Sequence, residues 1–129
     1  MGKGKIEKVI GKISKEVTDR YKLYDYTNVD IVQSMDLYIH TIKHREEFKT
    51  IDNYRNAIFN VEKVIQCPDF VYYDKNKKSL QYLKKLDENV CVVVKLILSK
   101  NKRPYVATVY PINEKKINKL KELSYLNND

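Results

Sequence analysis

The pattern of apolar and polar positions predicts two strands at the start of the chain. Residues 5–14 alternate imperfectly between polar and apolar side chains and predict a first strand, with Gly11 at a bulge. Residues 21–26 place tyrosine and leucine at every second position and predict a second strand.

Two amphipathic helices are predicted next. From Asn28 or Asp30, either of which is a suitable N-cap, apolar residues recur at spacings of three and four up to about Glu47. A second helix begins after Thr50 and is stopped by Pro68. The apolar stripes are Ile31, Met35, Tyr38, Ile39 and Ile42 in the first helix, and Ile51, Tyr54, Ile58, Val61 and Ile65 in the second.

After Pro68 the period changes to that of strands. We predict strands over 70–73, 80–84, 90–98 and 105–110, joined by polar turns, and a last helix carrying Ile117, Leu120 and Leu123. The stretch 90–98 is β-branched and almost wholly apolar, which is typical of a central strand covered on both faces. The expected fold is α+β: helices packed on a curved antiparallel sheet, a meander of four strands, in one domain over residues 1–129.

Composition excludes several classes of protein. With 43% hydrophobic residues the chain is too apolar to stay disordered. No apolar run is long enough to span a membrane, and no secretory signal is evident at the N-terminus, so we expect a cytoplasmic protein without a membrane partner. The three glycines all lie within the first eleven residues, which excludes a P-loop. Cys67 and Cys91 are expected to be reduced and buried thiols, with a disulfide as the alternative.

The net charge of +8 is unevenly distributed. Residues 70–129 contain thirteen basic and six acidic residues, residues 1–27 seven and four, and residues 28–69 five and seven. A compositional bias toward lysine explains part of the surplus, but a uniform bias does not predict this segregation. We therefore expect a basic face, built mainly from the C-terminal half, that attracts a polyanion.

The two histidines, His40 and His44, lie four residues apart on the first predicted helix. Both point away from the apolar stripe around Met35, where a group that titrates near neutral pH is free for acid–base work. An ordinary polar helix face has the same pattern. The spacing also suits two metal ligands, but no third ligand is indicated, so we expect no metal and no cofactor.

Three further features carry candidate chemistry. Lys95 interrupts the most apolar strand, so it either pairs at an edge or points into a pocket and neutralises a phosphate. In strand 105–110, Val106, Thr108 and Tyr110 are expected to share one face, where Thr108 and Tyr110 offer hydroxyl groups. Tyr82 and Tyr105 are candidate base-stacking platforms, although most of the eleven tyrosines must serve packing.

Taken in order along residues 36–112, these features resemble a known family. They are a histidine pair followed by Arg45-Glu46-Glu47, a helix ending in Cys67-Pro68-Asp69, and strands holding Tyr82, Lys95 and Thr108-Val109-Tyr110-Pro111. The set resembles the phage-associated branch of the barnase-EndoU-colicin-RelE (BECR) nucleases.

The resemblance implies a compact α+β nuclease that cleaves RNA without a metal. His40 or His44 would act as general base or general acid, Lys95 would stabilise the charge on the phosphate, and Thr108 or Tyr110 would orient it. Arg45, Tyr82, Tyr105 and Tyr110 are the candidate substrate-binding residues. Such domains are often toxins of mobile elements, for which an acidic antitoxin or immunity protein is the expected partner. The alternatives are a basic RNA- or DNA-binding module without catalysis, and a structural protein of a mobile element.

Overall fold

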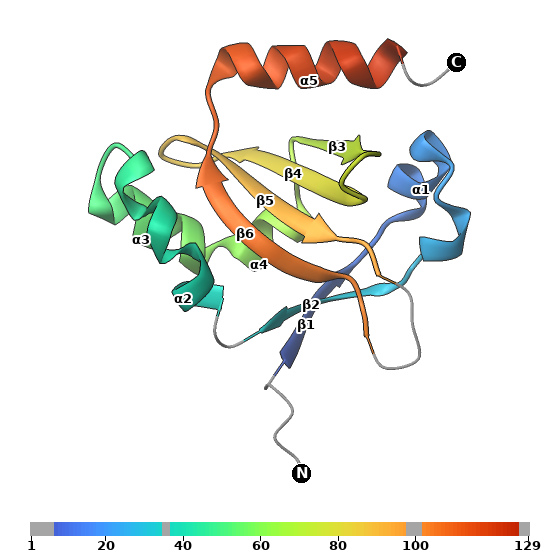
Figure 1. Ribbon diagram of the computed structural model, residues 1–129, viewed down its shortest axis with the longest axis horizontal. Helices are drawn as coiled ribbons and strands as arrows, with labels where there is room; N and C mark the ends of the chain where they lie inside the picture. The colour runs from blue at the N-terminus through green and yellow to red at the C-terminus, as the bar shows by residue number, and fades with distance from the viewer. Residues whose placement is uncertain (1–6, 35–36, 98–101, 127–129) are drawn as a thin grey trace.

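The computed structural model describes residues 7–34, 37–97 and 102–126, and only the backbone of His40. Its elements follow one another as β1 (Glu7–Lys12), α1 (Lys15–Tyr21), the 3₁₀ turn η1 (Tyr24–Tyr26), β2 (Asp30–Ser34), α2 (Leu37–Thr41), the 3₁₀ turn η2 (Ile42–Glu47), α3 (Ile51–Phe59), α4 (Val61–Gln66), β3 (Phe70–Asp74), β4 (Ser79–Lys85), β5 (Asn89–Lys95), β6 (Tyr105–Pro111) and α5 (Glu114–Leu126). Figure 1 shows how these elements are arranged.

The described strands form one six-stranded sheet in the order β1-β2-β6-β5-β4-β3. The predicted antiparallel meander is confirmed for β3, β4, β5 and β6. The expected number of four strands is wrong, because the antiparallel pair β1–β2 joins the sheet through a parallel contact between β2 and β6. That contact includes a hydrogen bond from the Val32 amide to the Pro104 carbonyl at 3.0 Å.

The predicted bulge at Gly11 is confirmed, since the β1–β2 register shifts between Val9 and Gly11. A Cβ atom at this position would lie 3.0 Å from Cγ2 of Ile65, closer than nearly all natural contacts. Gly11 therefore lets α4 approach β1, where the Gln66 side chain donates a hydrogen bond to the Ile10 carbonyl.

Two helix predictions fail where tertiary pairing or a local cap decides the structure. The stretch expected to begin a helix at Asn28 or Asp30 contains β2, because Ile31 and Val32 are buried between neighbouring strands. Of its predicted stripe, Met35 lies outside the described residues. The strand expected over 21–26 is absent: Ser14 caps α1 by accepting a hydrogen bond from the Val17 amide, and Lys22 ends that helix with a φ of 58°.

The second helix prediction is correct in its start and its end. Thr50 caps α3, with its hydroxyl oxygen accepting from the Asn53 amide at 3.0 Å. The predicted single helix is instead split into α3 and α4 at Asn60, whose side chain donates to the Asn56 carbonyl. This local bond competes with helix continuation, as asparagine side chains commonly do.

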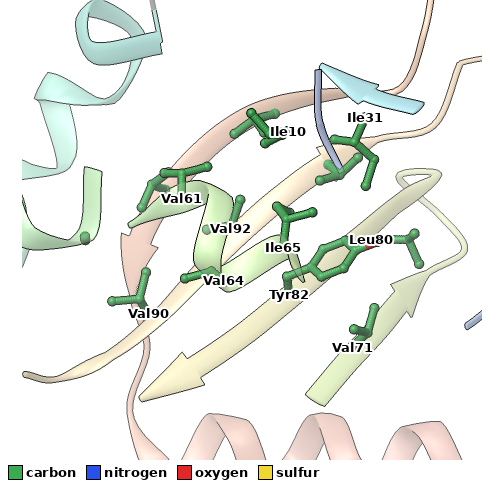
Figure 2. Packing of buried hydrophobic residues seen from close by; sticks show 14 of the residues in the cluster. Ile10, Ile31, Val61, Val64, Ile65, Val71, Leu80, Tyr82, Val90 and Val92 are labelled. Atoms are coloured by element: carbon green, nitrogen blue, oxygen red, sulfur yellow. The ribbon is translucent and has the colours of Figure 1, made fainter. Parts of the chain in front are cut away.

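Helices cover both faces of the sheet. The main core lies where α1, α3 and α4 pack on one face, and its central residues Val61, Val64, Ile65, Tyr82 and Val92 converge in Figure 2. On the other face, Ile117 and Leu120 of α5 pack on Leu83 and Cys91. The expectation of a central strand covered on both faces is thus correct for the Cys91 end of β5, whereas Val93 and Lys95 further along the strand are only half-buried.

Candidate active site

Cross-strand pairing places three rows of side chains on the sheet face that α5 partly covers, because directly opposed residues share a face. The inner row is Phe70, Leu83, Cys91 and Tyr110; the middle row is Tyr72, Gln81, Val93 and Thr108; the outer row is Asp74, Ser79, Lys95 and Tyr105. α5 packs on the inner row, whereas all four middle-row residues are only half-buried. We call the middle and outer rows the open face.

A second bulge decides which β6 residues belong to this face. The β5–β6 register shifts between Val93 and Val94, so that Tyr105 lies opposite Lys95 while Val106 lies opposite Val94 in the core. The predicted grouping of Val106 with Thr108 and Tyr110 is therefore wrong. Tyr105 is the residue that joins Thr108 and Tyr110, and 37% of its surface is exposed.

His44 lies at the β6 end of the inner row. Its Nδ1 is 2.6 Å from Oε2 of Glu47, and its ring centroid is 6.0 Å from that of Tyr110. The imidazole side chain is 22% exposed, and among the described residues its Nε2 has no hydrogen-bond partner. A histidine held by a carboxylate through one nitrogen, with the other nitrogen free, is arranged for proton transfer.

Tyr54 anchors both ends of the η2 turn that carries His44. At the start of η2, the hydroxyl groups of Thr41 and Tyr54 are 3.4 Å apart. At its end, the Phe48 ring meets the Tyr54 ring edge-on at 5.6 Å between centroids. Tyr54 is fully buried. The turn is thus fixed to α3 while its His44 side faces the sheet.

Tyr110 connects His44 to the residues under α5. Burial is the main cause that raises the pKa of its hydroxyl group, and nearby Cys91, Asp74 and Glu47 raise it further. The hydroxyl therefore keeps its proton at neutral pH. The ammonium group of Lys116 lies 5.9 Å from the Tyr110 ring centroid. Tyr110 thus has the imidazole of His44 and the cation of Lys116 as neighbours.

The other predicted site residues are distributed unevenly. Lys95 is on the open face, but it lies four residues beyond Cys91 in β5, a distance of about 13 Å along the strand. Its ammonium group donates a hydrogen bond to the Lys77 carbonyl at 3.1 Å. Thr108 lies between them, with its hydroxyl oxygen buried and unpartnered within the described part of the chain. Arg45 is exposed on η2. The side chain of His40 lies outside the described residues.

Tyr82 does not belong to this face. Tyr82 of β4 lies opposite Val92 of β5 and faces the main core, and only 2% of its surface is exposed. A buried ring has no free face on which a base can stack, so the prediction of a stacking role is wrong for this conformation.

Sequence reasoning missed Glu47 as the partner of His44, and it missed Lys116 entirely. The spacing of three residues between His44 and Glu47 is a detectable signal, because such residues are neighbours on a helical turn. Lys116 has no such signal: only the packing of α5 on the inner row brings it to Tyr110.

A pocket of about 550 Å³ lies beside Glu47, lined also by the β4–β5 turn and the start of α5. Its lining holds four carboxylates, those of Glu47, Asp87, Glu88 and Glu114, against the two lysines Lys49 and Lys85. This negative balance disfavours a phosphate group.

With this geometry established, comparison with known proteins identifies the family. Residues 7–119 match the family described as phage-Barnase-EndoU-ColicinE5/D-RelE like nuclease3. The chain belongs to this family. The resemblance inferred over 36–112 is thereby confirmed, and the match extends to β1, α1, β2 and the first part of α5. Searches of curated proteins and of solved structures returned no match.

The described residues lack two further features. They contain no helix long and apolar enough to cross a membrane. Within the same residues, no three His, Cys, Asp or Glu side chains are grouped as a metal ion would need.

The two cysteines of this nuclease-family protein are expected to differ strongly in reactivity. Both are free thiols, but the prediction that both are buried is wrong for Cys67, which is exposed. Burial raises the pKa of the Cys91 thiol to about 12, against weaker opposing effects of Tyr110 and Lys116. Because the thiolate is the reactive form, a thiol reagent at pH 8 should modify Cys67 at least about a hundredfold faster than Cys91.

Time-resolved mass spectrometry of the modified protein measures the two rates, and equal rates would contradict the buried position of Cys91.

The raised pKa of Cys91 also makes the stability of the protein depend on pH. The unfolded chain releases this proton near pH 8.5 and the folded chain only near 12. The contribution of Cys91 to the free energy of unfolding is therefore fully present below about pH 8.5 and is lost as the pH rises toward 12.

Proposed function

We propose that this protein is a metal-independent endoribonuclease that cleaves RNA by attack of the ribose 2′-hydroxyl on the adjacent phosphate. The observation that carries the proposal is the His44–Glu47 pair, held against Tyr110 at the margin of the open face. Membership of a nuclease family supports cleavage of nucleic acid. RNA is favoured as the substrate because its 2′-hydroxyl group is the nucleophile. The protein then has to supply mainly a proton acceptor and a cation near the phosphate.

In this proposal, the free Nε2 of His44 takes the proton of the 2′-hydroxyl group. Glu47 fixes the orientation of the imidazole through Nδ1 and stabilises the imidazolium that forms, the role a carboxylate has beside a catalytic histidine elsewhere. The 2′-oxygen bonds to phosphorus, the bond to the 5′-oxygen breaks, and the leaving oxygen takes up a proton. His40, on the preceding helix α2, remains the candidate for that second proton transfer.

Cations on both sides of the open face supply attraction for the phosphates. Lys116 lies beside Tyr110, close to the proposed proton transfer, and is the better candidate to stabilise charge on the attacked phosphate. Lys95, at the outer row, is placed to bind a neighbouring phosphate of the same strand. A contact from Thr108 requires its side chain to rotate, because its hydroxyl oxygen is buried.

A role as a toxin of a mobile element extends the proposal. The family description names phage, and α5 presents Lys115, Lys116, Lys119 and Lys121 against only Glu114 and Glu122. A neutralising protein with an acidic surface would complement this helix and cover the approach to His44.

The experiment compares RNA with DNA of the same base sequence, each in EDTA and in magnesium. We expect the protein to cleave single-stranded RNA equally in both buffers, to leave 2′,3′-cyclic phosphate or the 3′-phosphate formed from it, and to leave DNA intact. Chromatography and mass spectrometry of the products identify the ends. A magnesium requirement, 5′-phosphate ends or cleavage of DNA would overturn the mechanism. Binding of RNA that weakens with salt, without cleavage, would support the non-catalytic binding module instead.

A further inference from the structure

A second group of cations and aromatic rings lies at the β3 end of the inner row, on the far side of the sheet face from His44. It consists of Arg20 from α1, Phe70 from β3, and Lys121 and Tyr125 from α5, and we call it the Arg20 cluster. The guanidinium carbon of Arg20 is 5.4 Å from the ring centroid of Phe70 and 5.6 Å from that of Tyr125. The ammonium group of Lys121 is 5.9 Å from the same Phe70 centroid.

Within the described part of the chain, the two positive charges of this cluster, on Arg20 and Lys121, have no carboxylate to compensate them. The Nε of Arg20 is buried without a hydrogen-bond partner within that part of the chain. Contacts with aromatic rings attract a cation but leave its charge in place. Two like charges gathered on one ring therefore favour binding of an anion between or beside them.

The aromatic members of the cluster differ in exposure. Phe70 is half-buried under α5, whereas Tyr125 is 66% exposed and has Arg20 as its neighbour. An exposed ring next to unpaired cations is the combination by which proteins hold single-stranded nucleic acid: the cations bind phosphates and the ring stacks on a base.

We propose that the Arg20 cluster is a binding subsite for single-stranded RNA, taking nucleotides that flank the bond cleaved at His44. Arg20 and Lys121 bind the phosphate, and Tyr125 stacks on the adjoining base. This inference rests on the proposed function, because it takes the substrate of that site to be RNA.

The distance between the two sites matches a short segment of one strand. Phe70 and Tyr110 are the two ends of the inner row, separated by three strand spacings of about 4.8 Å, about 14 Å in all. Stacked nucleotides advance about 3.4 Å each, so about four of them cover this distance, and fewer suffice in an extended strand. α5 covers the inner row itself, and its Lys116 and Lys121 contact the rings at the two ends of that row, Tyr110 and Phe70.

Binding of an uncleavable strand tests the subsite separately from catalysis. The probe is a fluorescent single-stranded RNA in which every 2′-hydroxyl is methylated, titrated with the full-length protein at several salt concentrations. Lys121→Gln should reduce the slope of log affinity against log salt by about 0.7, the value of one phosphate contact on a single strand. Tyr125→Ala should weaken binding about five- to a hundredfold, the range found for loss of one stacked base.

Matched controls come from the same chain. Lys63→Gln removes an exposed charge from α4, which packs on the other face of the sheet, and Tyr24→Ala removes a tyrosine that is 61% exposed on η1. Both should leave the slope and the affinity near those of the unchanged protein. Melting temperatures of all four variants show whether each one folds.

Two results would overturn the subsite: Lys121→Gln and Tyr125→Ala indistinguishable from their controls, or an annealed duplex of the probe bound as tightly as the single strand. If Lys121→Gln and Tyr125→Ala weaken binding as expected while their controls do not, and yet unmodified RNA is not cleaved, the subsite stands and the proposed catalysis fails. If RNA is cleaved but the four variants bind alike, the catalysis stands and the subsite fails.

Discussion

Replacing His44 with alanine should lower the rate of RNA cleavage at least about a hundredfold, the lower range for loss of a general acid or base. The folded structure should persist, because the side chain is partly exposed and, within the described residues, it contacts Glu47 and Tyr110. We expect the melting temperature to fall by less than about 4 °C. Initial rates with a labelled RNA, measured beside a thermal melt, give both quantities.

Glu47→Gln is the matched control for this prediction. It keeps a side chain that can hydrogen-bond to Nδ1 of His44 but removes the charge that stabilises the imidazolium. We expect a smaller loss of activity, about tenfold. An alanine variant at His44 that retains full activity would show that proton transfer occurs elsewhere. One that loses activity together with its melting transition would show only that His44 supports the fold.

Tyr54→Ala should produce the largest loss of stability, about 3–5 kcal/mol in the free energy of unfolding, as for other large aromatic residues removed from a core. Tyr54 is fully buried, its ring contacts those of Tyr38 and Phe48, and its hydroxyl group meets Thr41. Removing it leaves a cavity beneath η2 and releases both ends of the turn that carries His44. Urea denaturation followed by circular dichroism measures the change.

Tyr54→Phe separates the ring from the hydroxyl group. It keeps the ring contacts and loses only the long contact of 3.4 Å with Thr41, so we expect a loss of about 1 kcal/mol or less. Under conditions where both variants are folded, cleavage should be near normal in Tyr54→Phe and strongly reduced in Tyr54→Ala. A loss of less than about 1 kcal/mol in Tyr54→Ala would contradict the anchoring role of this ring.

Sequence pattern predicted the meander well because each of its strands carries its own signal. The β-branched run 90–94 and the alternation in 105–110 correspond to β5 and β6, and the turn after β3 is closed by Asp74, whose side chain accepts from the amides of Asn76 and Lys77. Such turns and alternations are local, so neighbouring residues suffice to reveal them.

The failures have a different cause. Ile31 and Val32 fit the periodicity of a helix, but their burial beside β1 and β6 makes them a strand, and no residue close in sequence signals this pairing. The bulge near Val93 moved Tyr105 onto the open face for the same reason, since a bulge depends on the partner strand.

The candidate site was predicted in part. His44, Tyr110 and Lys95 do lie on or beside one sheet face, and Tyr105 joins them only because of the bulge near Val93. Tyr82, a candidate stacking platform, is buried in the main core, because the alternation in β4 does not say which side the core lies on. Lys116 and the Arg20 cluster depend on how α5 crosses the sheet, and that crossing is set by the packing of Ile117 and Leu120 on Leu83 and Cys91.

The most direct test of the central claim is a single 2′-deoxy substitution in an RNA substrate, placed at the nucleotide whose 3′-phosphate the protein cleaves. The 2′-hydroxyl is the proposed nucleophile, so removing that one oxygen should abolish cleavage at this bond in EDTA while the same substitution one nucleotide away leaves it unchanged. Continued cleavage at the substituted bond would show that water or a protein group is the nucleophile, and would contradict the mechanism proposed for His44.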